Sequence, residues 1–523
     1  MTLPTSSQQT ASTPEIGVSV FSKDVTIALQ SEYQILNTLP RFKEKVPSGL
    51  TIELDVVLGN DSKVYIVECI DGVPRAFRVG TKKADQIYHR LAKATTSLRS
   101  IDIKEINDRL IAWAHANGTC HPIYCRIGPS GNGIEIDCGH SCILVQPGHV
   151  EFNYKHSRNV FYTNAVALHL PVPANKGDVT LLKKYMNLTD MDQVLFLAWL
   201  SYTLGHPKIS STKFLILVIN GDQGSGKSFI SQNIILPLID PSMVGIQVFP
   251  STVSDFTIAA NNAHLLCYDN MRNFKQSMAD ILCMASTGGV ISSRTLYTND
   301  EQHIQRLHVA LVLNGIHQFI NESDLAERCL TIRPKPITEN QRRSESEMVM
   351  GLQQDLPIIF RGLLDLIAEI FQKLPEAKVL KPKRMIDFVY WLSAMELIDG
   401  VKPGTYQSGY DDIMNASQLD SLLGNLLASA IVDFVDSDAM QDGRWVGTPT
   451  ELLEALELQI GPYAIKSSEW PNNPIALSKR LNSLKASLAT QSIRIEFRRG
   501  RARLIRISNL TYGSAKQDHF EAI

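Results

Sequence analysis

The chain has 523 residues, 44% of them hydrophobic and 20% charged, with a formal net charge of −2. This length is too great for one hydrophobic core and predicts two to four domains, while the near-neutral charge requires any nucleic-acid-binding surface to be local. No apolar run is long enough to span a bilayer, and residues 1–16 form a polar tail without a signal core. We therefore expect a cytoplasmic protein without a membrane partner.

The N-terminal part of the chain, residues 17–171, is expected to form an α+β domain. Thr51–Val57 and Val64–Ile70 are β-rich and separated by a turn sequence, whereas Lys82–Leu98 and Ile101–Ala116 have helical spacing. We find no acid–base pair, nucleophile pair or two-metal carboxylate pattern in this region. Its role is expected to be recognition or assembly.

Four cysteines cluster in this domain with two histidines nearby. Thiolates and imidazoles suit a tetrahedral zinc site, but the spacings inside each cysteine pair are looser than usual. Reduced structural cysteines and a zinc site are the two alternatives for the set Cys120, Cys125, Cys138 and Cys142.

A linker at residues 172–177 leads into a second domain, which is predicted at 177–340. This domain opens with a helical segment, Leu181–Leu204, and a phosphate-binding loop follows. Phe214–Ile219 predicts a buried strand, and Ile230–Leu236 can continue the loop as a helix. Between them lies G-x-x-x-x-G-K-[ST], whose backbone N–H groups, lysine and hydroxyl bind the phosphates and Mg²⁺ of a nucleoside triphosphate. The predicted ATP-binding residues are Gly221, Gln223, Gly224, Ser225, Gly226, Lys227 and Ser228.

A second apolar strand, Ala263–Asp269, ends in an acidic residue in the manner of a Walker B motif. Asp269 would hold Mg²⁺ opposite Ser228, although a strand-terminal Asp in a turn is the alternative. Asn270 occupies the position where many such ATPases carry the base that activates water. An amide cannot accept that proton, which favours binding over hydrolysis.

The next two strands are predicted at Val290–Leu296 and Gln305–Leu313, on either side of an acidic turn. Asn314 ends the second strand, where an amide can sense the γ-phosphate. Arg328 follows and is a candidate arginine finger for a neighbouring subunit, with Arg333 in reserve. The alternative for Arg328 is a surface arginine paired with Glu327.

A helical lid is predicted at 341–427, beginning with a long amphipathic helix over Glu345–Phe371. Arg384, a later residue of this predicted lid, is either a second γ-phosphate sensor or a surface cation.

The C-terminal segment 428–508 has a winged-helix pattern, followed by a tail at 509–523. Thr448–Glu451 forms a capping box, Asn473-Pro474 opens a second helix, and a two-stranded hairpin comes after it. Its cations can contact duplex DNA, although a charged edge strand is the alternative. The predicted DNA-binding residues here are Lys479, Arg480, Arg498, Arg499, Arg501 and Arg503, beside Arg494 and Arg506.

The ordered motifs GDQGSGKS, LLCYDN, STGGVISSRTLYTND, LVLNGI and DLAERCL resemble those of AAA+ helicases of superfamily 3, of the phage, plasmid and satellite type. They are similar, more tightly, to a group of ATP-binding proteins of bacterial mobile elements, from about residue 80 to 505. This resemblance implies a multidomain α/β protein with an AAA+ P-loop core that forms a homo-oligomer, a hexameric ring.

The resemblance also implies that ATP turnover drives movement on DNA, as in a replicative helicase or origin-remodelling protein. Single-stranded DNA would pass through the ring and meet the hairpin within 290–310, which carries Arg294, Tyr297, His303 and Arg306. The tip of that hairpin is acidic here, where the family has basic residues. The alternative is an ATP-binding regulatory, loader or defence protein with slow hydrolysis, and a small-molecule phosphotransferase is a third reading.

Overall fold

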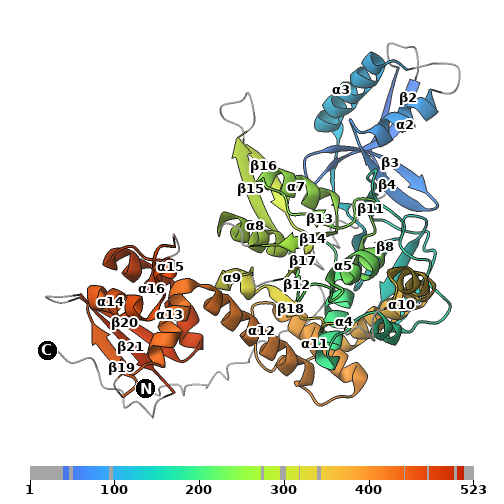
Figure 1. Cartoon of the computed structure of the whole chain (residues 1–523). Helices are drawn as coiled ribbons and strands as arrows, with labels where there is room; N and C mark the ends of the chain where they lie inside the picture. The colour runs from blue at the N-terminus through green and yellow to red at the C-terminus, as the bar shows by residue number, and fades with distance from the viewer. Residues whose placement is uncertain are drawn as a thin grey trace, which may run out of the picture.

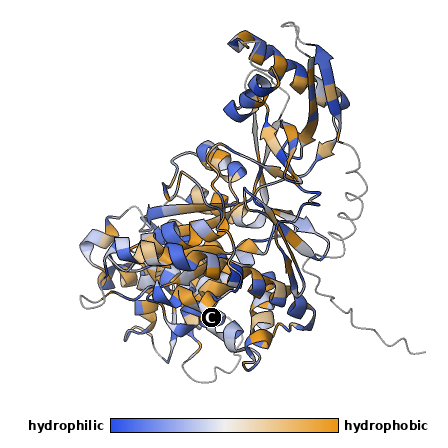
Figure 2. Ribbon diagram, turned by 90° about the vertical axis from the view of Figure 1, so that its right-hand side faces the viewer, coloured by the Kyte–Doolittle hydropathy of each residue, from blue (hydrophilic) through white to orange (hydrophobic). Residues whose placement is uncertain are grey.

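The computed structural model describes residues 39–45, 51–92, 98–272, 276–294, 302–316, 319–337, 343–440, 442–467, 470–499 and 503–511, without side chains at 292–294, 302–305 and 499. Figure 1 shows an N-terminal unit above a central α/β body, with a C-terminal unit to one side. Hydrophobic residues concentrate on the elements inside the body, as the turned view in Figure 2 shows.

The N-terminal unit is built on a seven-stranded sheet in the order β1-β2-β3-β4-β11-β6, with β5 paired to β2. The predicted strands at 51–57 and 64–70 are present as β2 and β3, and the second predicted helix as α3, because alternation and helical spacing are local signals. The helix predicted at 82–98 is present as α2 but ends at Leu91, and residues 93–97 lie outside the described residues. The elements are β1 Arg41–Lys45, β2 Thr51–Gly59, β3 Val64–Ile70, β4 Val73–Arg78, α2 Lys82–Leu91, α3 Ser100–Asn117, β5 Cys120–His121, β6 Ile123–Tyr124 and β11 Val160–Tyr162.

A second, four-stranded antiparallel sheet lies between this unit and the central body, in the order β10-β9-β8-β7. Its strands are β7 Ile127–Ser130, β8 Gly133–Asp137, β9 Cys142–Gln146 and β10 His149–Glu151. Ile127, Ile134 and Val145 belong to the same hydrophobic core as the helices of the central body. The core therefore does not divide at the predicted boundary near residue 171.

The central body contains a five-stranded parallel sheet in the order β13-β14-β17-β12-β18. Both faces are covered, which explains why its strands are almost continuously apolar. The strands are β12 Ile216–Asn220, β13 Gln247–Val248, β14 Leu265–Met271, β17 Ala310–Gly315 and β18 Cys329–Ile332. The helical segments between them are α5 Lys227–Phe229, the π-helical η2 Ile230–Ile235, α6 Leu236–Ile239, α7 Val253–Asn262, α8 Gln276–Thr287 and α9 Ser323–Ala326.

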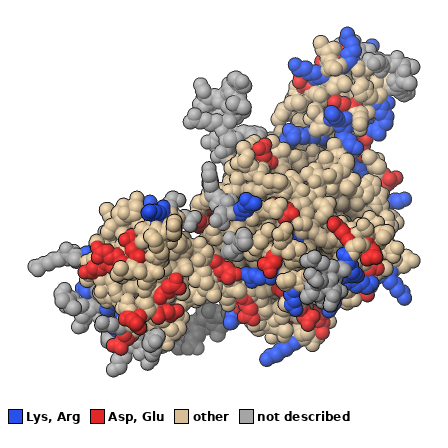
Figure 3. Space-filling model, in the orientation of Figure 1, with Lys and Arg blue, Asp and Glu red and all other residues tan. Residues whose placement is uncertain are grey.

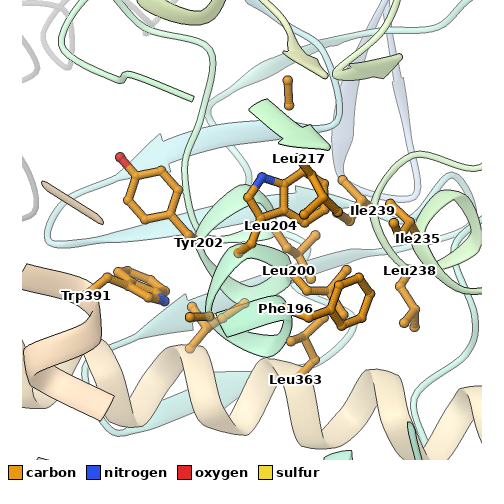
Figure 4. Close-up of a cluster of buried hydrophobic side chains, with 14 of the residues drawn as sticks. Phe196, Leu200, Tyr202, Leu204, Leu217, Ile235, Leu238, Ile239, Leu363 and Trp391 are labelled. Carbon is orange, nitrogen blue, oxygen red and sulfur yellow. The ribbon is translucent and has the colours of Figure 1, made fainter. Parts of the chain in front are cut away.

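Helix α4 packs at the centre of this body. The helical segment predicted at 181–204 is two pieces, the 3₁₀ helix η1 Val179–Lys184 and α4 Asp190–Leu204, because Thr189 caps a new helix start by accepting the N–H of Asp192. Figure 4 shows Phe196 and Leu200 of α4 among buried side chains from the sheet, α6 and the later helices. Through this packing, α4 supports β12, the strand that leads into the predicted phosphate loop.

The predicted strand at 305–313 is wrong, because that segment forms two strands in different sheets. β16 Gln302–Leu307 pairs antiparallel with β15 Gly289–Arg294, whereas β17 lies in the central parallel sheet. The chain turns at His308-Val309, where the Val309 N–H donates to the Ala285 carbonyl. A continuous apolar run in the sequence gives no sign that the chain passes from one sheet to another.

The helical region beyond the sheet consists of α10 Glu345–Lys373, the 3₁₀ turn η4 Leu374–Glu376, α11 Ile386–Asp399, α12 Thr405–Gly424 and α13 Leu426–Val435. The long helix is present as predicted. No single described helix is long and apolar enough to cross a membrane, and α12 with α13 passes that test only as a pair bent by 101°.

The C-terminal unit combines three helices with a three-stranded sheet in the order β19-β21-β20 around its own core. Both reciprocal hydrogen bonds of the predicted capping box form between Thr448 and Glu451. The elements are β19 Arg444–Gly447, α14 Pro449–Gln459, α15 Pro462–Ile465, α16 Pro474–Thr490, β20 Ile493–Arg499 and β21 Arg503–Asn509. Strand β19 adds to the predicted hairpin.

Three buried histidines of the central body give the fold a pH dependence. Burial lowers the pKa of His206 and His264 to about 4 and that of His308 to about 3, from 6.5. The unfolded chain therefore takes up protons below pH 6.5 that the folded chain does not, so stability falls as the pH drops from 6.5 towards 4, each histidine costing on the order of a few kcal/mol.

Chemical denaturation at pH 7 and pH 5 measures this loss. His206→Asn keeps a donor for the Tyr202 carbonyl, which lies 2.8 Å from Nδ1, and should lessen the pH slope. Replacement of the exposed His149 by Asn is the control and should leave the slope unchanged. An equal slope in all three proteins would contradict this assignment.

Candidate nucleotide site and nucleic-acid surfaces

The predicted phosphate loop connects the carboxyl end of β12 to α5. Gly224 and Gly226 have φ values of 79° and 85°, a left-handed conformation that favours glycine, and a Cβ at Gly224 would meet only open space. The Lys227 side chain lies over the loop, where Nζ donates to the carbonyls of Gly221 and Asp222, both at 2.7 Å. Burial lowers the pKa of this lysine.

Ser228 and Asp269 meet at the same edge of the sheet, although 41 residues separate them. The Ser228 hydroxyl donates to Oδ2 of Asp269 at 2.7 Å, and Oδ1 of that carboxylate accepts the backbone N–H of Asn270 at 2.8 Å. Two oxygen donors at this spacing are a set that Mg²⁺ accepts. Asn270 has a φ of 55° and an exposed side chain.

Asn314 lies at the end of β17, the strand between β12 and β14. It is fully buried, and its Oδ1 accepts a 3.0 Å hydrogen bond from the Ser231 hydroxyl. The Asn314 Nδ2 is buried and has no hydrogen-bond partner among the described residues. A buried amide donor of this kind needs an acceptor, and a phosphate oxygen or a bound water fits it.

Ser231 was not predicted, because its role depends on the π-helical turn Ile230–Ile235. The segment predicted as a helix at 230–236 consists of this turn and the first residue of α6. Pro237 in α6 has no N–H to donate, which suits a departure from regular α-helical bonding. A serine in an apolar helical run gives little signal in the sequence.

For the ATPase function that the sequence predicts, removing the Ser231 hydroxyl should lower turnover. In Ser231→Ala the Asn314 oxygen loses its donor, so the amide is no longer held in one orientation, and kcat should fall about tenfold with little change in KM. The matched control is Ser286→Ala, another fully buried serine, whose hydroxyl donates to the Cys283 carbonyl. Equal kcat values in both variants would exclude the positioning role of Ser231.

Arg328 lies at the opposite edge of the sheet from the phosphate loop. It precedes β18, and its carbonyl accepts the N–H of Ile216 at the amino end of β12, so the five residues of β12 separate it from the loop by about 15 Å. Arg328 is 9% exposed and pairs with Asp324 at 3.4 Å, so the alternative of a surface arginine paired with Glu327 is wrong. Arg328 cannot reach the phosphate site of its own chain.

Arg384 also lies at this amino edge, which excludes it as a second sensor within its own subunit. Its guanidinium pairs with Asp324 at 2.5 Å and with Glu327 at 3.0 Å. Arg333, the reserve arginine, follows β18 at the carboxyl edge and pairs with Asp420. Both placements follow from the parallel topology, because the amino ends of all the strands lie at one end of the sheet and the carboxyl ends at the other.

The predicted DNA-binding hairpin is β15–β16, but only part of it is described. Arg306 is exposed on β16. Arg294 and His303 lie in the paired strands without described side chains, and Tyr297 and the acidic tip lie outside the described residues.

The C-terminal cations are spread over α16 and the β20–β21 hairpin. Lys479 and Arg503 are exposed, Arg480 and Arg498 are half-buried, and the Arg503 guanidinium lies 5.9 Å from the Phe497 ring centre. The structure does not describe the Arg499 side chain, and Arg501 lies outside the described residues. On the face of this unit that Figure 3 presents, the coloured side chains are mostly Asp and Glu.

The cysteine cluster does not assemble a metal site. Within the described residues no group of three or more His, Cys, Asp or Glu side chains is placed to hold a metal ion. Cys138 and Cys142 are buried thiols, Cys120 is exposed, and burial raises the pKa of Cys138 to about 12.

Comparisons with known proteins give two family matches and a set of structural similarities. Two apo structures of the A form of the NrS-1 C-terminal region cover 87% of this chain and 96% and 95% of theirs, at 11% and 12% identity and TM-scores of 0.36 and 0.38. Similarities this low support no argument about fold or function. No curated protein matches the chain.

The two family matches lie one after the other. Residues 179–416 match the actinomycete integrative conjugative element replication protein family, and residues 427–517 match the AICE RepA C-terminal domain. The junction between them falls at the α12–α13 bend, near the predicted boundary at 427. Together, the two matches identify the chain as a replication protein of a mobile genetic element.

Proposed function

We propose that this chain is an ATPase that couples ATP hydrolysis to movement on DNA during replication of the element. In this proposal the central body is an AAA+ P-loop core of the superfamily 3 type, the helices after it form a lid, and the C-terminal unit is a winged helix. The observation that carries the proposal is the 2.7 Å hydrogen bond between Ser228 and Asp269. It brings the hydroxyl after the loop lysine next to the acidic residue of the second strand, so both oxygen atoms lie within reach of one Mg²⁺.

Each residue of the site has a separate task in binding and turnover. Lys227 and the loop amides would hold the phosphates, and Ser228 with Asp269 would hold Mg²⁺, which supplies charge neutralisation at the transferred phosphoryl group when bound. Asn314 would direct its free amide donor at the phosphate or the attacking water. These tasks follow from the donor set and from the unpartnered Nδ2.

The neighbouring subunit would complete the site. Arg328 lies too far from its own loop to act there, so its use as an arginine finger requires a second copy of the chain, as in the hexameric ring that the resemblance implies. The ion pair with Asp324 would then have to open on assembly. Two buried guanidinium nitrogens of Arg328, Nε and Nη1, have no partner among the described residues and are available to an incoming acceptor.

A second candidate function is an ATP-dependent DNA-binding regulator, loader or defence protein that hydrolyses slowly. The observation that favours it is Asn270, an amide beside Asp269 where a catalytic base is expected. Such a protein would use the nucleotide to assemble on DNA rather than to move along it.

Steady-state ATPase measurements with and without single-stranded DNA separate the two functions. The motor function predicts turnover that rises when DNA is added. A rate near zero that DNA does not stimulate would overturn it and leave the regulator.

Subunit mixing tests the ring. Arg328→Ala should lose most ATPase activity, because one removed arginine finger costs about 10³-fold or more. Mixed with Lys227→Ala, it should regain part of that activity, since each protein supplies the group that the other lacks. Failure to regain activity would assign Arg328 a structural role within its own subunit, where it pairs with Asp324.

A further inference from the structure

A cavity of about 310 Å³ lies away from the phosphate loop, where three parts of the chain meet. Asn60 and Tyr162 of the N-terminal unit form one wall, Lys208 follows α4, and Arg306 and His308 come from the base of the β15–β16 hairpin. The hairpin and the N-terminal unit both rise from the top of the body in Figure 1. Of these residues, only Arg306 belongs to a predicted DNA-binding surface.

The cavity holds two cations without a paired carboxylate. Lys208 donates to the carbonyls of Ala260 and Ala263, both at 2.8 Å, which leaves one of its three N–H donors for another acceptor. Neither Lys208 nor Arg306 has an acidic partner within ion-pair distance among the residues that the structure describes. Burial lowers the pKa of Lys208 by more than Cys125 and Asp240 raise it.

Among the described residues that line the cavity, the one carboxylate, Asp61, is already neutralised. Asp61 pairs with Lys63 at 3.1 Å and accepts the Tyr65 hydroxyl at 2.8 Å. The described lining therefore carries an excess of positive charge in a partly desolvated space, which favours an anionic ligand.

The rest of the lining points to a ligand larger than a simple anion. The rings of Tyr65 and Tyr162 lie edge to face, 5.8 Å apart, in one wall, and Asn60 and Asn261 also line the cavity. Aromatic rings accept a stacked base, and amides hydrogen-bond to base edges. The volume lies at the lower end of the range of about 300–1,000 Å³ found for small-ligand sites.

We infer that this cavity binds a nucleotide unit, with its phosphate at Lys208 and Arg306 and its base at the tyrosine wall. The ligand is either one nucleotide of a single DNA strand that leaves the β15–β16 hairpin or a free nucleotide. Both offer a phosphate and a base to the cavity. The strand form rests on the proposed function, because it requires DNA at the hairpin. The inference gives the N-terminal unit a part in strand binding.

Fluorescence anisotropy of the full chain with a labelled dT20 oligonucleotide, in the absence of ATP, tests this site. Ser210→Trp fills the cavity from an exposed lining position, and Arg306→Gln removes one cation. Each should weaken oligonucleotide binding at least tenfold, and Arg306→Gln should lower the salt slope by about 0.7. The matched control is Lys104→Gln, an exposed cation on α3, which should bind as the wild type does.

Competition and cross-linking distinguish the two sources of the nucleotide. If unlabelled dTMP displaces dT20, a free nucleotide fits the site, and if only oligonucleotides do, the ligand is a strand. A bromodeoxyuridine oligonucleotide should cross-link to the peptide that contains Tyr162. The inference would be overturned if Ser210→Trp and Arg306→Gln both bound DNA as the wild type does and no cross-link to this peptide formed.

The binding assay also separates this inference from the proposed function. An absence of ATPase activity in the wild type would contradict the motor but would leave this ATP-free measurement intact. A wild type that binds neither dT20 nor dTMP would overturn the cavity site.

Discussion

Lys227→Ala should abolish ATP binding or reduce ATPase turnover by at least about a hundredfold. The lysine lies over the loop with Nζ 2.7 Å from two loop carbonyls, and it supplies the positive charge that the β- and γ-phosphates need. The measurements are binding of a fluorescent ATP analogue and steady-state phosphate release, with and without single-stranded DNA.

The control for this experiment is Lys176→Ala, which removes an exposed lysine from the linker before η1. It should leave binding and turnover unchanged. Circular dichroism should show the same secondary structure for both variants, because the lost hydrogen bonds lie within one loop. Unchanged ATPase activity in Lys227→Ala would show that the nucleotide binds elsewhere.

Arg126→Met should destabilise the junction between the four-stranded sheet and the central body by about 3–5 kcal/mol. The Arg126 guanidinium, almost fully buried, pairs with Asp240 at 3.0 Å and donates to the carbonyls of Asp137 and Leu168. Its removal leaves the Asp240 carboxylate buried without a cation. The effect should be larger than that of any exposed ion pair.

The same variant should loosen the strand that carries Asp269. The second oxygen of Asp240 accepts the backbone N–H groups of His264 and Leu265, where β14 begins. Hydrogen exchange at these amides should therefore become faster in Arg126→Met, and ATPase activity should fall with it. Chemical denaturation gives the accompanying loss in the free energy of unfolding.

Two further variants complete the experiment. Arg99→Met removes an exposed arginine from an i,i+3 pair with Asp102 and should change stability far less, because exposed ion pairs contribute little. Arg126→Met combined with Asp240→Asn should recover part of the loss, since an amide oxygen still accepts the two N–H groups and no charge is left unpaired. Equal stability of Arg126→Met and Arg99→Met would refute the assignment.

Local signals in the sequence were sufficient for much of the fold. The glycine positions of the loop at 221–226, the capping box at Thr448 and the long apolar stripe of α10 each depend on neighbours within a few residues, and each is present in the structure. The predicted strand at 305–313 failed for the complementary reason. Its apolar content is shared by two strands whose partners lie in different sheets, and periodicity carries no information about partners.

For the candidate site, the sequence by itself determined which residue types are present and in what order: the loop lysine and serine, the strand-terminal Asp269 and Asn314. Only the tertiary structure decided what they meet. The π-helical turn brings Ser231 to Asn314 across 83 residues, Arg126 reaches Asp240 across 114, and parallel topology places Arg328 at the edge away from the loop. Such contacts depend on strand order and helix register over the whole chain, because each partner is set by the packing of elements that are distant in sequence.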